Sequence, residues 1–253
     1  RSLVTFYPLS SNPNAWGQSL HLWGEPGRTI EASLGFADGA FNPSGNTPWI
    51  FTEDGPGMWE DEIVVNGDDT VFYDVVVEQS HPANGRPFLQ IRVHKGQSNV
   101  NVILQVTSPL GEVHAWNHTY LTNDVGNWGY DFSSAGQPGW TAGDPNYGAQ
   151  HPACSQNVIA VGAHSSDFVN SGGNEIGGQL AFFSSFGPTL DGRLKPSLSG
   201  PGVNVESSLS SFRDGSYNVT ETVDFEGTAY EFARLSGTSM SSPAVAGIVA
   251  LML

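Results

Sequence analysis

The sequence predicts a mixed fold: a jelly-roll-like β-sandwich over residues 1–122, followed by an α/β domain with a parallel sheet over residues 123–253. Three patterns indicate this fold. Short apolar runs with period-two alternation recur over residues 16–119. Residues 157–163 form a nearly continuous apolar run, which is typical of a strand covered on both faces in a parallel sheet. Residues 242–253 are small and apolar all round, as in a buried helix.

The predicted sandwich contains six clear strands, at residues 18–23, 29–36, 61–65, 70–77, 88–94 and 99–106. Turn chemistry separates neighbouring strands, with Asn-Gly-Asp-Asp at residues 66–69 and Lys-Gly-Gln at residues 95–97. In the fifth strand Leu89, Ile91 and Val93 alternate with polar residues. One face of that strand is therefore expected to be buried and the other wet.

A change of composition separates the two predicted domains. Residues 123–157 are rich in Gly, Asn, Asp, Pro and Trp without a sustained period, which indicates a boundary and a long surface loop. The terminal helix places Pro243 in its first turn, where proline is tolerated. It has no glycine cap and no basic last turn, so we expect a natural domain to continue beyond it.

Charge and apolar patterning exclude several classes of function. The chain has 25 acidic and nine basic side chains, a formal net charge of -16, so it repels phosphate backbones and nucleic acid is not an expected partner. No apolar run is long enough for a membrane span, and the first residues do not form a signal peptide. Cys154 is the only cysteine, so no internal disulfide is possible.

The octet at residues 236–243, Ser-Gly-Thr-Ser-Met-Ser-Ser-Pro, carries the chemistry. It places Ser239 between a glycine turn and a helix start, where backbone N–H groups and the helix dipole stabilise a developing oxyanion. The alternative is that these serines only cap the helix, because serine and threonine are favoured N-cap residues.

The octet resembles the serine motif of the subtilisin-like proteases, or subtilases: GTSM, two small residues, proline and a small-residue helix. Residues 183–196 resemble the subtilase segment FSSxGPTxDGRxKP. Residues 200–203 are similar to the family's APGV, with Gly200 in place of alanine. Residues 152–153 and 157–163 resemble the strand before them. Counting residues 200–203 with the 183–196 segment, these are three blocks, and they follow the family's order.

The resemblance implies an extracellular serine endopeptidase acting on protein or peptide substrates through an acyl-enzyme on Ser239. It implies that the Ser239 N–H donates to the oxyanion and that the Thr238 hydroxyl lies nearby. Gly237 would allow the backbone to approach, Pro243 and Gly247 would pack the helix, and Pro201-Gly202 would shape a turn. No cofactor is required for this chemistry, although structural calcium is compatible with it.

The resemblance is incomplete, because the family's aspartate, histidine and oxyanion asparagine motifs do not occur. No histidine is followed by the family's Gly-Thr, and Asp38-Gly39 and Asp54-Gly55 have the form of turns. Residues 134–137, Ser-Ala-Gly-Gln, approximate the AAGN segment but have glutamine in place of asparagine. Some bacterial subtilases carry a β-sandwich insertion after AAGN, so the three missing motifs are expected in an N-terminal part of the catalytic domain that precedes residue 1. The chain alone is then expected to be inactive.

Several alternatives stay open. His151 or His164 would be the base if one lay in this chain. The sandwich would be a non-catalytic module that recognises protein or carbohydrate if its tryptophans (Trp23, Trp49, Trp59 and Trp116) were exposed rather than packed in the core. Acidic residues at 60–62 and 66–69 are candidate calcium ligands or solvated turns. An α/β-hydrolase elbow, G-x-S-x-G, is excluded because residue 241 is serine.

Overall fold

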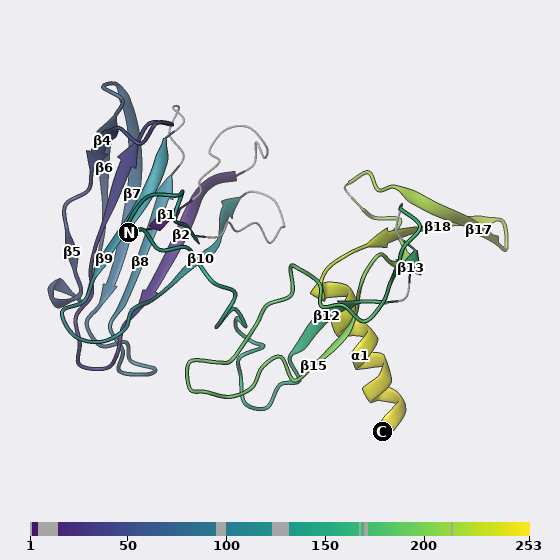
Figure 1. Ribbon diagram of the computed structural model, residues 1–253. Helices are drawn as coiled ribbons and strands as arrows, with labels where there is room; N and C mark the ends of the chain where they lie inside the picture. Colours follow the sequence, from purple (N-terminus) through teal and green to yellow (C-terminus); the bar gives the residue numbers. More distant parts are fainter. Residues whose placement is uncertain are drawn as a thin grey trace. The chain divides into compact units, whose positions relative to one another are not determined.

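The computed structural model describes residues 2–4, 15–94, 100–122, 132–166, 168–169, 172–213 and 215–253. The chain divides into two compact units, Arg1–Asp144 and Pro145–Leu253 (Figure 1). The predicted boundary at 122/123 adjoins residues 123–131, which lie outside the described residues. The described part is mostly β-strand with a single α-helix, consistent with the mixed fold that the sequence predicts.

Unit 1 contains two antiparallel sheets. One has the strand order β11 (Phe132–Ser133), β1 (Ser2–Val4), β9 (Asn101–Thr107), β3 (Glu31–Ala37), β4 (Pro43–Asn46), with β5 (Ile50–Phe51) also on β3. The other has the order β10 (His114–Thr122), β2 (Ala15–Trp23), β8 (Phe88–His94), β7 (Asp69–Glu78), β6 (Gly57–Val65). A short 3-10 helix, η1 (Thr52–Asp54), follows β5.

The two sheets of unit 1 share one hydrophobic core. Leu34 and Leu104 come from the first sheet, Leu20, Val75 and Ile91 come from the second, and all five side chains are buried in one cluster. Such burial on one face of each strand follows from the period of two in the side-chain direction. The alternation predicted for residues 88–94 is confirmed, since β8 is buried at every second position.

The predicted turn between β6 and β7 is also confirmed. Asn66 and Gly67 have φ angles of 52° and 89°, a left-handed conformation that asparagine and glycine adopt at low cost. The Ser44 hydroxyl donates to Asn66 Oδ1 at 2.8 Å and fixes that side chain. The turn predicted at residues 95–97 lies outside the described residues.

Unit 2 has a parallel pair of strands, β12 (Val161–Ser165) and β15 (Leu198–Val203), against which the helix α1 (Thr238–Met252) packs. Two further antiparallel sheets follow. In one, β13 (Phe168–Val169) pairs with β14 (Glu175–Ile176). In the other, β18 (Thr228–Leu235) pairs with both β16 (Val205–Ser208) and β17 (Val219–Phe225). The β17–β18 hairpin extends away from β12, β15 and α1 (Figure 1).

Three local predictions for unit 2 were wrong in their bounds or burial. The strand predicted at 157–163 begins at Val161, because residues 157–160 form a turn and irregular backbone. The helix begins at Thr238, not at residue 242, so Pro243 lies in its second turn. Only Ser241 and Val245 of the helix are buried, because nothing in the described part of unit 2 covers its other faces.

Candidate functional site

Ser239 is the second residue of α1, and its side chain is exposed. The preceding segment is fixed to the end of β15 by two hydrogen bonds. The Gly237 N–H donates to the Gly202 carbonyl at 2.8 Å, and the Asn204 N–H donates to Ser236 Oγ at 2.9 Å. These two hydrogen bonds therefore hold the turn before Ser239 in place. The exposed Ser239 side chain is carried by a fixed backbone position.

The alternative that the serines of the octet serve only to cap α1 is wrong. The N-cap residue is Gly237, and no side chain makes a capping hydrogen bond. Thr238, the first helical residue, is half-buried beside the exposed Ser239. In the first turn the Met240 N–H donates to the Gly237 carbonyl at 3.1 Å. The N–H groups before it have no acceptor four residues earlier within α1, which makes this end of the helix suited to an anion.

Pro243 stands four residues after Ser239. Proline has no N–H, so the Ser239 carbonyl loses the helical donor that any other residue at position 243 would supply. The proline therefore loosens the backbone ladder of α1 at the residue that carries the exposed hydroxyl. It is neither the helix start nor a first-turn residue.

Two glycines of β15 let α1 lie close to the sheet. A Cβ atom on Gly200 would lie 3.0 Å from the Ser241 carbonyl oxygen and 3.1 Å from Val245 Cγ2. A Cβ atom on Gly202 would overlap Ser241 Oγ and would lie 2.9 Å from the Gly237 carbonyl oxygen. Gly202 lies within the strand, not in a turn as predicted, and its function is close approach.

Ser241 is fully buried between the helix and the sheet, and its hydroxyl has no partner among the described residues. A buried hydroxyl without a hydrogen bond costs roughly 1–3 kcal/mol. Ser239 and Ser241 thus differ sharply although they are two residues apart, since one hydroxyl meets solvent and the other is enclosed. Of these two hydroxyls, only that of Ser239 is accessible to a substrate.

The segment at 183–196 has a structural function. Arg193 bonds to Asp191 Oδ2 through Nε at 2.8 Å and to the Cys154 carbonyl through an Nη atom at 2.8 Å. The Arg193 hydrogen bond, followed by that of Thr189, lowers the pKa of Asp191 to about 2. These contacts tie the loop before β15 to the loop before β12.

No described histidine is hydrogen-bonded to Ser239. His164 lies in β12, where its Nδ1 is 3.0 Å from Ser199 Oγ, and His151 is exposed before Pro152. The predicted turn at Asp38-Gly39 is confirmed, because the N–H groups of Ala40 and Asn42 both donate to Asp38 Oδ1.

Two other segments that approximate family motifs are also local structure. Asp54 ends η1, and Gly55 follows as its C-cap. In the second segment the Gln137 N–H donates to the Ser134 carbonyl at 2.8 Å and closes a turn. Both segments therefore serve the local backbone, one as a helix end and the other as a turn.

The tryptophans of unit 1 divide between core and surface. Trp59 packs against the core cluster, whereas the Trp49 side chain is 46% exposed. Trp23 and Trp116 are half-buried, and the Trp23 ring lies 4.4 Å, centroid to centroid, from that of Phe88.

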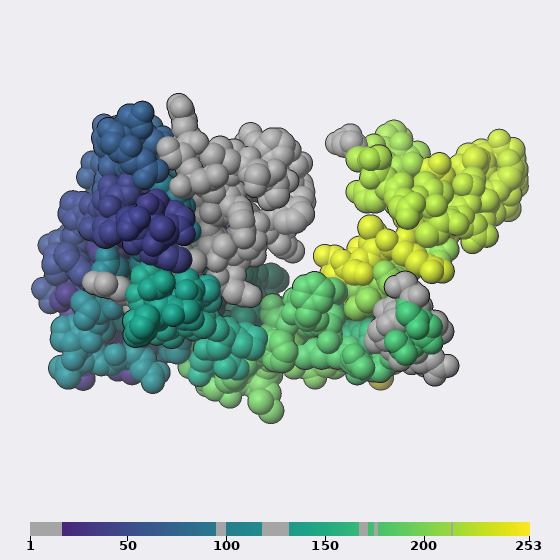
Figure 2. Space-filling model, turned by 45° about the horizontal axis from the view of Figure 1, so that its top comes forward, coloured from purple at the N-terminus to yellow at the C-terminus, as the bar shows by residue number. Residues whose placement is uncertain are grey.

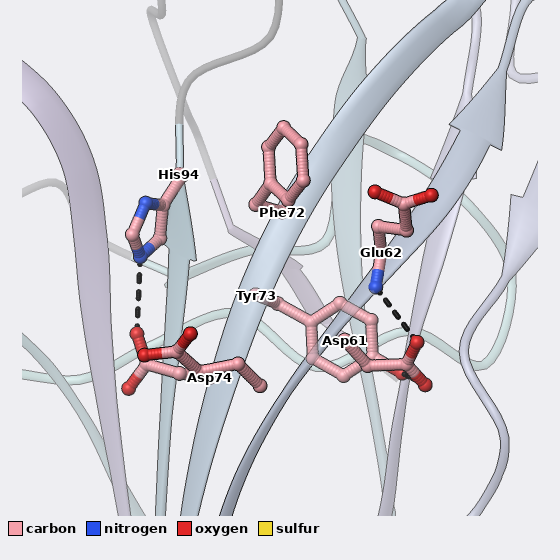
Figure 3. Close-up of a pocket in the computed structure, with 7 residues that line it drawn as sticks. Asp61, Glu62, Phe72, Tyr73, Asp74 and His94 are labelled. Atoms are coloured by element: carbon pink, nitrogen blue, oxygen red, sulfur yellow. Dashed lines mark hydrogen bonds and ion pairs between the residues drawn. The ribbon is translucent and has the colours of Figure 1, made fainter.

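Unit 1 also has an acidic pocket of about 440 Å³ on its second sheet (Figure 3), lined by Glu60, Asp61, Glu62, Phe72, Tyr73, Asp74 and His94. His94 Nε2 lies 3.0 Å from Asp74 Oδ2, and Arg92 also pairs with this buried carboxylate. The buried Tyr73 hydroxyl donates to Asp61 Oδ2 at 3.1 Å. Burial, together with the Asp61 carboxylate, raises the pKa of Tyr73 to about 12. Among the described residues no three His, Cys, Asp or Glu side chains are placed to hold a metal ion.

The model of the subtilase family matches residues 126–253, just over half of the chain. The chain belongs to the subtilase family. The matched region contains the whole of unit 2, including the octet that ends in α1 and the 183–196 segment. The resemblance that the sequence motifs indicate is therefore confirmed.

Relatives of this subtilase include serine protease AprX of Bacillus subtilis, 35% identical over 102 residues, which are 40% of this chain and 22% of AprX. Pyrolysin of Pyrococcus furiosus is 40% identical over 75 residues, 30% of this chain and 4% of pyrolysin. C5a peptidase of Streptococcus pyogenes is 38% identical over 76 residues, 30% of this chain and 5% of that protein. The chain thus matches only a small part of each of these relatives.

Among solved structures, the CspB protease of Clostridium perfringens resembles this subtilase with a TM-score of 0.54 and 19% sequence identity. The match covers 99% of this chain and 42% of the CspB chain, so it includes both units. At this identity the likeness shows the fold. No described helix of the subtilase is both long and apolar enough to cross a bilayer.

Proposed function

We propose that this subtilase chain is the nucleophile-bearing part of a serine endopeptidase that cleaves peptide bonds in proteins through an acyl-enzyme on Ser239. The observation that carries the proposal is the exposed hydroxyl of Ser239 at the braced N-terminus of α1. The protease names of the relatives agree with it.

In the proposed reaction, Ser239 Oγ attacks the peptide carbonyl carbon and its proton passes to a general base. The C–N bond then breaks, and the base returns the proton to the leaving amine. Water then attacks the acyl carbon while its proton passes to the base, the ester C–O bond breaks, and the base returns the proton to Ser239 Oγ. The Ser239 N–H and the N-terminal end of α1 face the oxyanion, and the half-buried Thr238 adds a hydroxyl beside it.

The proposed base is not in this chain. His164 is engaged with Ser199, and His151 lies in the loop before β12. We assign the histidine, the aspartate that orients it and the oxyanion asparagine to an N-terminal part of the catalytic domain. Without them the Ser239 hydroxyl is a weak nucleophile, so the chain alone does not turn over substrate.

Exposed apolar side chains on unit 2 support this assignment. They come from the loops around the parallel strands and from α1, and include Ile159 (52% exposed), Phe182 (96%), Leu194 (88%), Ile248 (59%) and Leu251 (90%). A parallel sheet of two strands is uncommon by itself, since parallel strands are normally covered by helices on both faces. Further strands and helices of the catalytic domain would extend the β12–β15 sheet and cover these residues.

We also propose that unit 1 is a jelly-roll-like β-sandwich inserted in the catalytic domain. Residues 1–122 would form the insertion and residues 123–253 the catalytic part. The match to the CspB protease, which includes both units, supports this arrangement. We propose a secreted location from the names of the relatives, and no cofactor for the reaction. We also propose that calcium ions have a structural role in this protease.

The half-exposed aromatic face of unit 1 supports a second function. Trp23 and Phe88, with His81 5.0 Å from the Trp23 ring, lie on the side of the sheet away from the core. Aromatic surfaces of this kind bind protein or carbohydrate. If unit 1 is such a module, Trp23→Ala abolishes binding to a polysaccharide or protein ligand in a solid-phase assay, and Ser239→Ala leaves that binding unchanged.

The parent protein, with its N-terminal part, tests the peptidase function. Hydrolysis of labelled casein should be lost in Ser239→Ala, by roughly the 10⁶-fold typical of a removed nucleophile. Ser242→Ala is the matched control, because residue 242 is an exposed serine of the same helix. Retained hydrolysis in Ser239→Ala would refute the assignment, as would equal losses in the two variants.

A further inference from the structure

The hairpin formed by β17 and β18 directly precedes the octet that carries Ser239. A two-residue turn joins its strands, with Glu226 and Gly227 at φ angles of 51° and 77°. We call residues 219–235 the arm. In Figure 2 the arm forms part of the yellow-green lobe of unit 2. Its last strand ends at Leu235, so the arm and the nucleophile are linked by a few residues only.

The arm has two different faces. Cross-strand partners in an antiparallel pair lie on the same face, and successive pairs alternate between the two faces. Val223 lies opposite Tyr230, and Phe225 lies opposite Thr228, so these residues share one face. Glu221 lies opposite Phe232 on that same face. We call this set the apolar face of the arm.

The apolar face is exposed to solvent. Phe225 is 63% exposed, Tyr230 is 48% exposed and Val223 is 41% exposed. Every residue of β17 is exposed, and among the described residues β17 pairs with β18 alone. The outer edge of β17 therefore offers unpaired backbone groups beside a row of apolar side chains, which is the arrangement that binds an extended peptide as an added strand.

The charged side chains of the arm that lack an ion-pair partner are all acidic. Glu221, Asp224 and Glu226 of the arm have no cationic partner within unit 2's described ion pairs. The arm's own arginine, Arg234, pairs with Glu206, and Arg213 outside the arm pairs with Glu231. A peptide that pairs with the outer edge of β17 therefore contacts apolar side chains and carboxylates without a cationic partner. Apolar and basic side chains on the peptide would complement this surface.

We infer that the arm is a docking strand for the substrate polypeptide, which pairs with β17 in an extended conformation through apolar and Lys or Arg side chains. The inference rests on the proposed peptidase function, because docking next to Ser239 matters only if a peptide is to be cleaved there. The arm would raise the local concentration of substrate chain near the nucleophile.

A second copy of this chain is the main competing occupant. Two β17 strands paired antiparallel would bring their Glu221 and Asp224 carboxylates together, and the chain as a whole has a formal net charge of -16. Like charges on neighbouring strands destabilise the pair. Charge complementarity thus favours a basic peptide over self-association.

Fluorescence anisotropy tests the inference with the 253-residue chain carrying Ser239→Ala. The probes are two short fluorescein-labelled peptides, one alternating Val with Lys and the other alternating Val with Glu. The Lys peptide should bind more tightly than the Glu peptide. Phe225→Ser should weaken binding of the Lys peptide roughly tenfold, as for removal of an aromatic anchor. Phe212→Ser is the matched control, because Phe212 is 92% exposed and lies outside the arm.

A charge exchange makes the test specific for the arm. Glu221→Lys should reverse the preference, so that the Glu peptide binds more tightly, whereas Glu60→Lys, the same change at an exposed site of unit 1, should not. Unchanged binding in both arm variants would overturn the inference, as would a dimer in light scattering that Phe225→Ser dissociates. Because the assay lacks the Ser239 hydroxyl, a failed docking test leaves the casein result standing, and a failed casein test leaves the docking result standing.

Discussion

Gly202 lies so close to Ser241 that a side chain at position 202 would overlap the Ser241 hydroxyl. This contact sets the distance between β15 and the first turn of α1, and Gly237, whose N–H bonds to the Gly202 carbonyl, lies at the same junction. The position of Ser239 therefore depends on a glycine far away in the sequence.

Gly202→Ala should destabilise unit 2 by about 2 kcal/mol, the usual cost of overpacking a close contact. Hydrogen exchange of the α1 amides should accelerate accordingly. Gly247→Ala is the matched control, because a Cβ atom there would meet nothing within 4 Å and alanine favours a helix. Equal exchange in the wild type and Gly202→Ala would contradict the packing described for this junction.

Ser241→Ala should leave the stability unchanged or raise it by about 1 kcal/mol, because it removes a buried hydroxyl that has no partner among the described residues. Ser242→Ala removes the same hydroxyl from an exposed serine and should have little effect on stability. The two variants can be compared by thermal unfolding. A loss of more than about 1 kcal/mol in Ser241→Ala would show that the hydroxyl makes a stabilising bond.

Low pH should lower the stability of unit 2, because Asp191 becomes protonated. Its pKa is lowered to about 2 in the folded chain from an ordinary 3.8, so its contribution to stability is present above about pH 4 and is lost as the pH falls to about 2. Asp191→Asn should flatten this part of the pH profile of unfolding. Identical acid profiles in the variant and the wild type would exclude the Arg193–Asp191 pair as a contributor.

High pH should lower the stability of unit 1, because the Tyr73 hydroxyl ionises more readily in the unfolded chain. Its pKa is raised to about 12 from 10, so the unfolded chain loses the proton first and the free energy of unfolding falls between about pH 10 and about pH 12. Tryptophan fluorescence follows unit 1 selectively, because all seven tryptophans precede residue 145. Tyr73→Phe should have a flatter alkaline profile, and an unchanged slope would argue against the buried hydroxyl as its source.

Local patterns were sufficient to predict much of unit 1. Strand β8 follows from the alternation of Leu89, Ile91 and Val93, and the β6–β7 turn follows from Asn66-Gly67, because each depends on neighbouring residues only. The helix start was misplaced because Pro243 has the character of a first-turn residue, whereas the backbone of this helix tolerates it one turn later.

The rest depends on contacts that local patterns do not encode. The arm was not predicted, because Glu226-Gly227 is not one of the usual hairpin dipeptides and because polar residues such as Glu221 and Thr228 interrupt the apolar positions of its strands. The contact between Gly202 and Ser241 joins distant segments. The accessibility of Ser239 and the burial of Ser241 are set by that contact and not by the serine motif itself.

Fluorophosphonate labelling of the purified 253-residue chain, with the modified serine located by peptide mapping, tests the central claim most directly. The proposal makes Ser239 a nucleophile whose base lies outside these 253 residues, so it predicts slow labelling of the chain alone and rapid labelling of Ser239 in the parent protein with its N-terminal part. Rapid labelling of the isolated chain that Ser239→Ala abolishes would contradict the claim, as would rapid labelling of the parent protein at any other serine.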